Sequence, residues 1–357
     1  MNVGIFTFPN STSFGATLQM YALYQSVESL GYKAEVVNYF NAYMKAQQHV
    51  SKQSRARTTA RYLVHYRQHR KFHSFEKRNM VRYPSAAFTN PAKLPELSKR
   101  YRTIICGSDQ VWNPDITAGD MSYFLDFCGE ETRRVAYAPS FGITDFSENF
   151  KNNIQVELMR FHALSVREAP GQKVVEELTG QDVSLVCDPT FLISAEDWYS
   201  LECCHPAAKE PYIFYYTIRS SARLWNQCRT FAKEKGLKIV VVGGNRLKQW
   251  KEKDKNIIYA VDIGPEEWLY LVHHAQYVVT NSFHGTAFAV NFHKDFYLEM
   301  SSFTNSRLHQ IVDALDLGDR IIGDKDWSND HIDYVSVEQR LSPLRVSSLE
   351  YLKNALK

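Results

Sequence analysis

The sequence lacks several patterns that identify common classes of protein. Its 357 residues include 6 cysteines, but no CxxC pair and no Cys/His spacing typical of zinc. The simplest interpretation is reduced, mostly structural thiols, with no metal site and no cofactor. No run of roughly 18 apolar residues is present either, which argues against a transmembrane helix.

The net charge and the first residues argue against nucleic-acid binding and against a secretory signal. The formal net charge of +3 is too small to argue for binding to nucleic acid. The strand-like run Val3–Phe8 comes at once, without the basic segment and cleavage site of a secretory signal. There is no internal repeat and no low-complexity linker. We therefore expect a cytoplasmic protein.

What the sequence does contain is an alternation of strands and helices. Residues 3–39 are typical of a strand, a polar loop, a helix and a second strand. The loop has no GxGxxG pattern, so a dinucleotide fingerprint is not supported. Asn10, Ser11 and Gln19 lie where a strand gives way to a helix and are candidates for ligand contact. Alternatively, the loop only caps the helix.

Residues 45–82 form a basic segment. They contain eleven Lys or Arg residues and four His, against a single acidic residue, Glu76. The spacing of the apolar residues is weakly helical. Such a segment is suited to an anionic membrane surface or an anionic substrate, although a basic solvated face explains it equally well.

A polar cluster directly follows the strand predicted at 103–106. Ser108, Asp109, Gln110 and Trp112 are expected at the edge of the sheet where ligands bind. Asp109 is a candidate base, or else it only forms a local turn. Trp112 is suited to stacking on a sugar face, but tryptophan is more often a core residue.

Further strands at 134–141, 163–167 and 184–191 alternate with helices, which implies parallel pairing. Arg167 ends one of these strands. A second series of strands and helices starts after residue 210. We therefore predict two α/β halves, each with its own parallel sheet, and a cleft lined by strand ends from both. The expected segments are 1–194, 195–325 and a C-terminal tail, 326–357, that packs back on the body.

The stretch 277–291 is expected to form the centre of the second α/β half. It has the pattern of a buried strand, a tight turn and the start of a helix. The turn carries His284, and the N–H groups of Gly285 and Thr286 at the helix start favour an anion. His284 is therefore a candidate catalytic group, unless it only caps the helix or hydrogen-bonds in the core. Arg307, early in the helix expected at 304–315, would lie beside the same crevice.

Six motifs in this order resemble the polysaccharide pyruvyl transferase family across most of the chain. The resemblance implies a fold like that of the two-domain GT-B glycosyltransferases. It also implies transfer of pyruvate from phosphoenolpyruvate onto two hydroxyls of a saccharide as a cyclic ketal. The motifs occupy residues 14–23, 106–114, 165–168, 187–192, 279–285 and 304–307.

Ketal formation needs a general acid and a base, and phosphoenolpyruvate needs cationic partners. On this basis His284 is the predicted acid–base group, and Asp109 is a secondary catalytic candidate, either as a base or as a ligand of the acceptor hydroxyl. Some members of the family have Arg where this chain has Ser282, so the missing charge must come from another residue. The predicted donor ligands are Arg307, Arg167, Ser282, Gly285 and Thr286. The predicted acceptor ligands are Asn10, Ser11, Gln19, Ser108, Gln110 and Trp112.

Two alternatives remain open at this stage. A sugar-nucleotide glycosyltransferase of the same architecture would bind a nucleoside diphosphate near Gly243 and Gly244. A non-catalytic saccharide-binding relative would explain the absence of Arg at position 282. The acceptor sugar, and whether it is lipid-linked, are not readable from the sequence. Peripheral contact with the inner face of an anionic membrane through 45–82 is the accompanying expectation.

Overall fold

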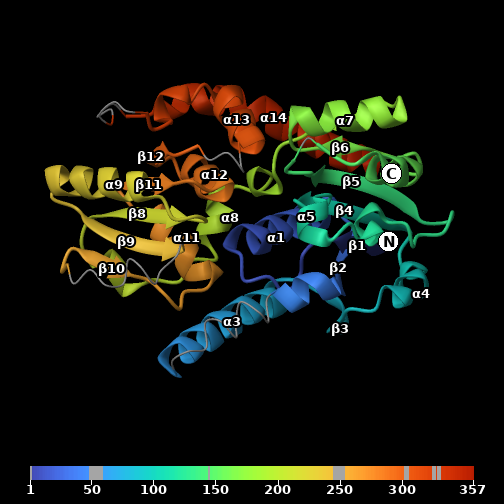
Figure 1. Ribbon diagram of the computed structural model, residues 1–357, viewed down its shortest axis with the longest axis horizontal. Helices are drawn as coiled ribbons and strands as arrows, with labels where there is room; N and C mark the ends of the chain where they lie inside the picture. Colours follow the sequence, from blue (N-terminus) through green and yellow to red (C-terminus); the bar gives the residue numbers. More distant parts are fainter. Residues whose placement is uncertain are drawn as a thin grey trace. The chain divides into compact units, whose positions relative to one another are not determined.

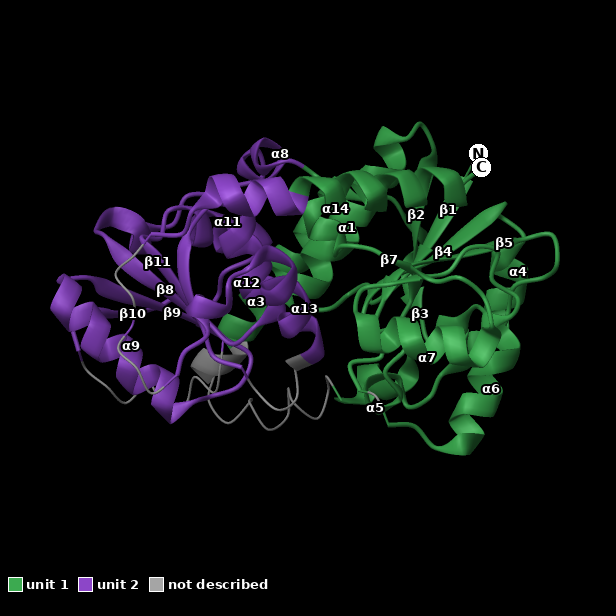
Figure 2. Ribbon diagram, turned by 90° about the horizontal axis from the view of Figure 1, so that it is seen from above, with its two compact units in different colours: residues 1–193, 342–357 green, residues 194–341 purple. Residues whose placement is uncertain are grey.

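The computed structural model describes residues 2–47, 59–143, 145–243, 254–300, 305–323, 327 and 331–357. The chain divides into two compact units, coloured separately in Figure 2. Unit 1 comprises residues 1–193 and 342–357, and unit 2 comprises residues 194–341. The stretch 326–357, set apart in the sequence as a tail, is therefore shared between the two units. Among the described residues, no helix combines the length and apolarity needed to cross a bilayer.

Unit 1 is built on a five-stranded parallel sheet. Its strand order is β3-β2-β1-β4-β5, so the chain starts in the middle and winds outward in both directions. A short parallel pair, β6 and β7, lies beside β5, where Val135 pairs with Ala163. The strands are β1 Asn2–Phe6, β2 Lys33–Tyr39, β3 Arg82–Phe88, β4 Thr103–Asp109, β5 Arg133–Pro139, β6 Ser165–Val166 and β7 Ser184–Leu185.

Unit 2 repeats the same topology with a different sequence. Its five parallel strands are ordered β10-β9-β8-β11-β12, which again starts in the centre and reverses direction once. The strands are β8 Tyr212–Thr217, β9 Lys238–Gly243, β10 Ile257–Tyr259, β11 Tyr277–Thr280 and β12 Asp295–Leu298. The prediction of two Rossmann-like halves with parallel sheets is thus confirmed.

The helices occupy the connections between parallel strands (Figure 1). Those of unit 1 are α1 Phe14–Ser29, α3 Thr59–Asn79, α4 Leu94–Ser98, α5 Pro114–Thr117, α6 Glu148–Leu158 and α7 Ala169–Thr179. Those of unit 2 are α8 Ala195–Tyr199, α9 Ala222–Lys235, α11 Pro265–His273, α12 Phe283–Asn291 and α13 Asn305–Leu315. The last helix, α14 Tyr334–Ala355, begins in unit 2 and ends in unit 1.

The end of α14 is held to unit 1 by polar contacts as well as packing. Ser348 Oγ accepts the backbone N–H of Cys187 at 2.9 Å, and Tyr351 donates its hydroxyl to the carbonyl of Ala136 at 2.8 Å. Proline is an unfavourable residue in the interior of a helix. In the structure the helix continues through Pro343.

The basic segment is helical where the structure describes it, from residue 59 on; residues 48–58 lie outside the described part. Helix α3 packs on α1 through Phe72 and Phe75, which are 2% and 0% exposed. Its single acidic residue, Glu76, is buried and accepts a hydrogen bond from Arg82 at 2.7 Å. Glu76 therefore stabilises the attachment of α3 rather than moderating the charge of its exposed face.

Candidate functional site

Both sheets have a topological switch point, where the strand order reverses and the two following loops diverge. Open α/β sheets bind ligands in the crevice at this point, beyond the carboxyl ends of the strands. In unit 1 the switch lies between β1 and β4, and in unit 2 between β8 and β11. We call these regions the carboxyl edges of unit 1 and unit 2. The predicted site residues fall on these two edges.

At the carboxyl edge of unit 2, side chains tie the loops together across the switch point. Asn281, directly after β11, accepts the N–H of Ile218 at 3.0 Å and donates to the carbonyl of Arg219 at 2.9 Å. Thr280 donates its hydroxyl to the carbonyl of Tyr216 at 2.7 Å. These bonds satisfy buried backbone groups where the strands end, and they fix the turn that carries His284.

The start of α12 explains two of the predicted donor ligands. Ser282 is the N-cap: its Oγ accepts the N–H of Gly285 at 3.3 Å. The carbonyl of Ser282 accepts the N–H of Thr286 at 3.0 Å. A side chain on Gly285 would overlap Thr280 Oγ1 and approach Tyr216, so only glycine fits. The N–H groups of Gly285 and Thr286 are therefore engaged within the turn.

His284 and Arg307 lie at the starts of two helices that follow adjacent strands of unit 2. His284 lies in the first turn of α12 after β11, and Arg307 lies in the first turn of α13 after the adjacent strand β12. The two helices pack against each other. His284 is 8% exposed and Arg307 is 5% exposed. The imidazole also meets the ring of Phe283 edge-on, with centroids 5.1 Å apart.

The carboxyl edge of unit 1 has a different character, because charged groups converge there from the ends of three strands, β4, β6 and β7. Arg167, 3% exposed, donates to Asp188 Oδ2 at 2.5 Å, and the guanidinium lies 3.9 Å from both Asp109 and Glu168. Burial alone would lower the pKa of Arg167, but these three carboxylates raise it instead. The positive charge of Arg167 is therefore already balanced by carboxylates within unit 1.

Hydroxyl groups complete this cluster. Ser140 donates to Glu168 at 2.6 Å, Thr190 donates to Asp188 at 2.8 Å, and Ser108 donates to Asp188 at 3.4 Å. Ser140 and Thr190 were not among the predicted site residues. The sequence places Ser140 directly after a strand and Thr190 in an Asp-Pro-Thr turn. These positions alone do not identify a site, because many such residues only form turns.

Asp109 differs from the two other carboxylates in exposure and in backbone conformation. Its side chain is 15% exposed, whereas those of Glu168 and Asp188 are at most 3% exposed. Its φ of 75° is in the left-handed region, as are those of Asn10 and Ala138 on the same edge. Such conformations cost about 1–2 kcal/mol each and gather at functional sites. Asp109 is thus the carboxylate of the three that solvent reaches.

The predicted acceptor residues near β1 are partly occupied by contacts within unit 1. Asn10 donates to Asn38 at 2.8 Å and accepts from Arg82 at 3.1 Å, which connects the loop to β3 and to buried Glu76. Gln19 is fully buried and donates to Thr7 at 3.3 Å. Half-buried Ser11 accepts the N–H of Ser13 at 3.1 Å.

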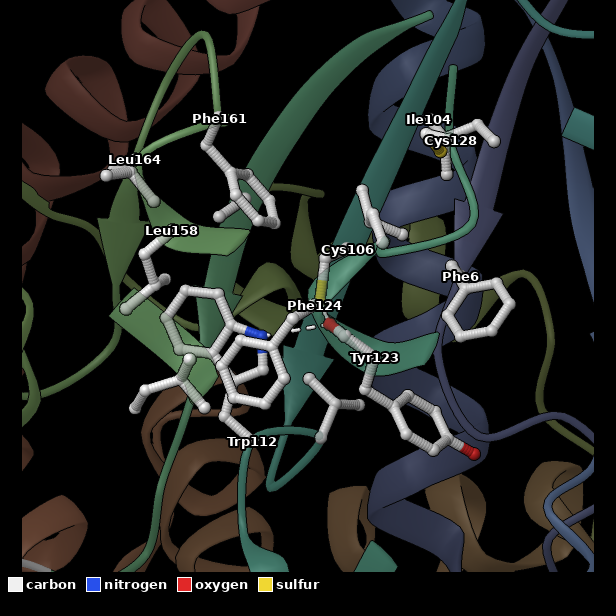
Figure 3. Packing of buried hydrophobic residues seen from close by; sticks show 14 of the residues in the cluster. Phe6, Ile104, Cys106, Trp112, Tyr123, Phe124, Cys128, Leu158, Phe161 and Leu164 are labelled. Atoms are coloured by element: carbon white, nitrogen blue, oxygen red, sulfur yellow. Dashed lines mark hydrogen bonds between the residues drawn. The ribbon is translucent and has the colours of Figure 1, made fainter. Parts of the chain in front are cut away.

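Trp112 belongs to the hydrophobic core of unit 1 (Figure 3). Its ring is 0% exposed and stacks on Phe124 with centroids 5.2 Å apart, and its N–H donates to the carbonyl of Tyr123 at 3.0 Å. The same carbonyl accepts from the Cys106 thiol at 3.0 Å. A ring buried in this way has no face to offer a sugar, and Ser108, also 0% exposed, is equally enclosed.

The sequence matches the model of the polysaccharide pyruvyl transferase family over residues 14–298. The chain belongs to this family. The matched range includes β11 and the turn with His284, and it ends nine residues before Arg307. No curated protein matches the chain in sequence.

Solved structures share the fold of this pyruvyl transferase family member at low sequence identity. A protein described as a UDP-N-acetylglucosamine 2-epimerase from Listeria monocytogenes has a TM-score of 0.55 at 9% identity, covering 99% of this chain and 90% of its own. HepE from Anabaena, solved in complex with UDP-glucose, has a TM-score of 0.54 at 11% identity, covering 99% and 100%. The UDP-GlcNAc 2-epimerase from Neisseria meningitidis has a TM-score of 0.53 at 9% identity, covering 99% and 94%. These matches establish a GT-B-like α/β fold.

Proposed function

We propose that this chain transfers pyruvate from phosphoenolpyruvate onto two hydroxyls of a saccharide acceptor as a cyclic ketal. Membership of the family supports the reaction class. The observation that carries the proposal is the turn after β11, where a buried imidazole lies at the switch point of unit 2. Histidine is the side chain most often used for general acid–base catalysis.

We assign the donor to the carboxyl edge of unit 2. Phosphoenolpyruvate carries a carboxylate and a phosphate, and a guanidinium matches both geometries. Because the N–H groups of Gly285 and Thr286 are engaged in the turn, the cationic partner is Arg307, whose helix packs on α12. Ser282 contributes by capping the helix. Arg167 is left out, because its charge is matched by carboxylates in unit 1.

We assign the acceptor hydroxyls to the carboxyl edge of unit 1, with Asp109 as the base. Asn10, Ser11 and Gln110 lie on the same edge and retain partial exposure. Ser108 and Gln19 are positioning residues, because Ser108 is bonded to Asp188 and Gln19 to Thr7. Trp112 is left out of the acceptor site because it is a core residue.

The proposed chemistry starts with proton transfer from His284 to the methylene carbon of phosphoenolpyruvate, which makes C2 electrophilic. One acceptor hydroxyl adds to C2 and gives its proton to Asp109. The C2–O bond to phosphate then breaks, and the second hydroxyl closes the ring. The acceptor loses two hydroxyl protons in the reaction. One of them makes up for the proton that His284 gives to the methylene carbon, and the other leaves with phosphate. Each acid or base contributes on the order of 10²–10⁴-fold in rate.

The test is to incubate purified protein with phosphoenolpyruvate and a panel of saccharides in deuterium oxide. Phosphate release, a matching mass gain on one saccharide, and a single deuterium in the new methyl group are the expected results. A methyl group without deuterium would contradict protonation at the methylene carbon. Phosphoenolpyruvate that binds without turnover on any acceptor would favour a saccharide-binding relative instead.

The donor assignment has its own test in Arg307→Gln, with Arg340→Gln as the matched control. Arg340 is on unit 2, is 43% exposed, and pairs with Asp316 at 3.0 Å. We expect the KM for phosphoenolpyruvate to rise in Arg307→Gln and to stay unchanged in the control. Unchanged donor kinetics in Arg307→Gln would remove this residue from the donor site.

The closest rival function is a sugar-nucleotide transferase, and HepE, which was solved with UDP-glucose, has the same fold. The glycine expected to favour a nucleotide has a different explanation here. A Cβ on Gly243 would lie 2.6 Å from the carbonyl of Thr217, and its φ is 79°, so the glycine is required by packing. Gly244 lies outside the described residues. Thermal shift with phosphoenolpyruvate and with nucleotide sugars separates the two functions, because a ligand of the native state raises Tm.

The basic segment 45–82 suggests where the acceptor is met. On the described part, Leu63 and Tyr66 are 49% and 52% exposed beside basic residues of α3. We propose peripheral contact with an anionic membrane and a lipid-linked acceptor. Co-sedimentation with vesicles containing anionic lipid is expected at low salt and not at high salt. Absence of binding at low salt would rule out this contact.

A further inference from the structure

Three side chains with metal-binding atoms meet on unit 2, away from its carboxyl edge. Glu202 follows α8, His273 ends α11, and His274 is the C-cap of α11. Strand β11 begins three residues after His274, so the group lies at the amino end of the strand whose other end leads to His284. This position separates the cluster from the groups proposed to act on the substrate.

The three side chains are close enough to share one ion. His273 Nδ1 lies 2.7 Å from Glu202 Oε1, and His274 Nδ1 lies 3.8 Å from Glu202 Oε2. One ligand atom from each residue fits within 4.8 Å of the others. Two ligand atoms around a tetrahedral zinc ion are about 3.4 Å apart, given zinc–ligand bonds of about 2.1 Å. Because the ligand atoms lie within 4.8 Å of one another, shifts of roughly 1 Å bring them to this spacing. His274 Nδ1 also lies 3.0 Å from the carbonyl of Tyr270, so the His274 ring has to turn when the ion binds.

Aromatic rings already orient both imidazoles. Tyr199 stacks on His273 and Tyr270 stacks on His274, with centroids 4.0 Å apart in each pair. Phe292 packs on His273 from a third element, with centroids 5.3 Å apart. Groups that hold the first ligands in place contribute strongly to metal affinity, because less order has to be imposed on binding.

We propose that Glu202, His273 and His274 bind one Zn²⁺ ion. Two imidazoles and one carboxylate are a ligand set that zinc accepts, with water in the fourth position. The side chains of Glu202 and His273 are 10% and 28% exposed, so the site is sheltered but reachable. A bound ion would join the end of α8 to the end of α11 and so stabilise unit 2.

Local spacing gives no sign of this site, because some seventy residues separate the glutamate from the histidines. The cysteines beside it, Cys203 and Cys204, are not disulfide-bonded and are outside the three-residue group. Lys294 also attracts the Glu202 carboxylate, so a bound cation has to compete with that charge. A bound zinc ion would contradict the prediction from the sequence that there is no metal site.

The test is a zinc titration of the untagged full chain after chelator treatment, in competition with a chromogenic zinc chelator. One equivalent should bind. Glu202→Gln and His274→Ala should each weaken binding on the order of 100-fold, since even changes beyond the ligands cost about 10–100-fold. His274 is 41% exposed, so its replacement should leave the fold intact.

The matched control is His293→Ala, which removes another His–carboxylate pair of unit 2, His293 with Glu338 at 3.1 Å. That variant should keep the affinity of the wild type. Zinc should also raise the Tm of the wild type and of the control, but not that of His274→Ala. Equal affinity in all the variants, or a Tm that does not respond to zinc in the wild type, would overturn the proposal.

Discussion

The two carboxyl edges share one strand order but are built from different chemistry. In unit 1, Arg167 and three carboxylates converge from successive strand ends, and Asn10, Asp109 and Ala138 are held at positive φ. In unit 2, the turn after β11 is made of neutral groups such as Thr280, Asn281 and Ser282, whose side chains are hydrogen-bonded to backbone groups of the same unit. His284 and Arg307 are buried at this edge, and the half-buried carboxylate of Glu299, directly after β12, accepts a hydrogen bond from Ser221 at 2.6 Å.

This difference indicates a division of work. A charged, strained edge suits binding and deprotonation of hydroxyl groups, because carboxylates accept their hydrogen bonds. An edge with a buried imidazole and a buried guanidinium suits an anionic donor, because a guanidinium matches the geometry of both carboxylate and phosphate. The two edges should therefore respond differently to substitution.

Removing the carboxylate nearest Arg167 should have the largest effect on stability. Asp188→Asn leaves a buried guanidinium without its partner at 2.5 Å, and breaking a buried ion pair costs about 3–5 kcal/mol. Urea unfolding would measure the loss. The control is Glu96→Gln, which breaks an exposed pair with Lys99 and should cost about 1 kcal/mol or less. Equal losses would show that the unit 1 cluster is not electrostatically coupled.

The proposed base gives the next largest effect, on rate. Asparagine tolerates positive φ, so Asp109→Asn keeps the backbone conformation while removing the charge. We expect kcat to fall on the order of 10²-fold, with the KM for phosphoenolpyruvate unchanged. Exposed Asp115, six residues on, supplies the control Asp115→Asn. Full turnover in Asp109→Asn would assign the base elsewhere.

In unit 2 the decisive constraint is steric. Gly285→Ala places a methyl group against Thr280 and Tyr216 and should cost about 1–3 kcal/mol of stability. Gly129→Ala is the control, because a Cβ there meets nothing within 4 Å and its φ is not positive. Thermal unfolding measures both. If the two variants were equally stable, the tight turn at α12 would not depend on this glycine.

Loss of a helix cap should be the smallest effect, and it compares the two units directly. Ser282 caps α12 in unit 2 and Ser147 caps α6 in unit 1, each accepting an N–H at 3.3 Å. Either change to Ala should cost about 1 kcal/mol. Only Ser282→Ala should also lower activity, because only that cap orients His284. Equal activity in the two variants would separate the cap from the site.

Much of this architecture was predictable because strands and helices have local signals. The β11 strand, the turn and α12 followed from the order of Val278, Val279, Asn281 and Gly285, and the alternation of elements predicted both parallel sheets. The stretch 184–191 was less regular than expected: it forms only a two-residue strand and then a 3-10 turn capped by Asp188. Here the hydrogen bonds of Asp188 to Thr190 outweigh strand propensity.

The contacts made by individual side chains were harder to predict, because they depend on which residues the fold brings together. The sequence around Arg167 is typical of an anion ligand, but in the fold this arginine pairs with Asp188. Trp112 was a candidate for stacking on a sugar, but in the fold Phe124 covers its ring. Glu76 is buried although it lies in the basic segment, because it pairs with Arg82 at the start of the next strand. Each of these outcomes depends on folding, which local spacing does not record.

The most direct test of the account is the rate of pyruvyl transfer in His284→Ala. Initial rates of phosphate release with saturating phosphoenolpyruvate and acceptor should fall 10²–10⁴-fold, roughly the contribution of one general acid. His293→Ala, a replacement of a surface histidine of the same unit, should keep the wild-type rate. Wild-type turnover in His284→Ala would contradict the central claim that the carboxyl edge of unit 2 supplies the acid.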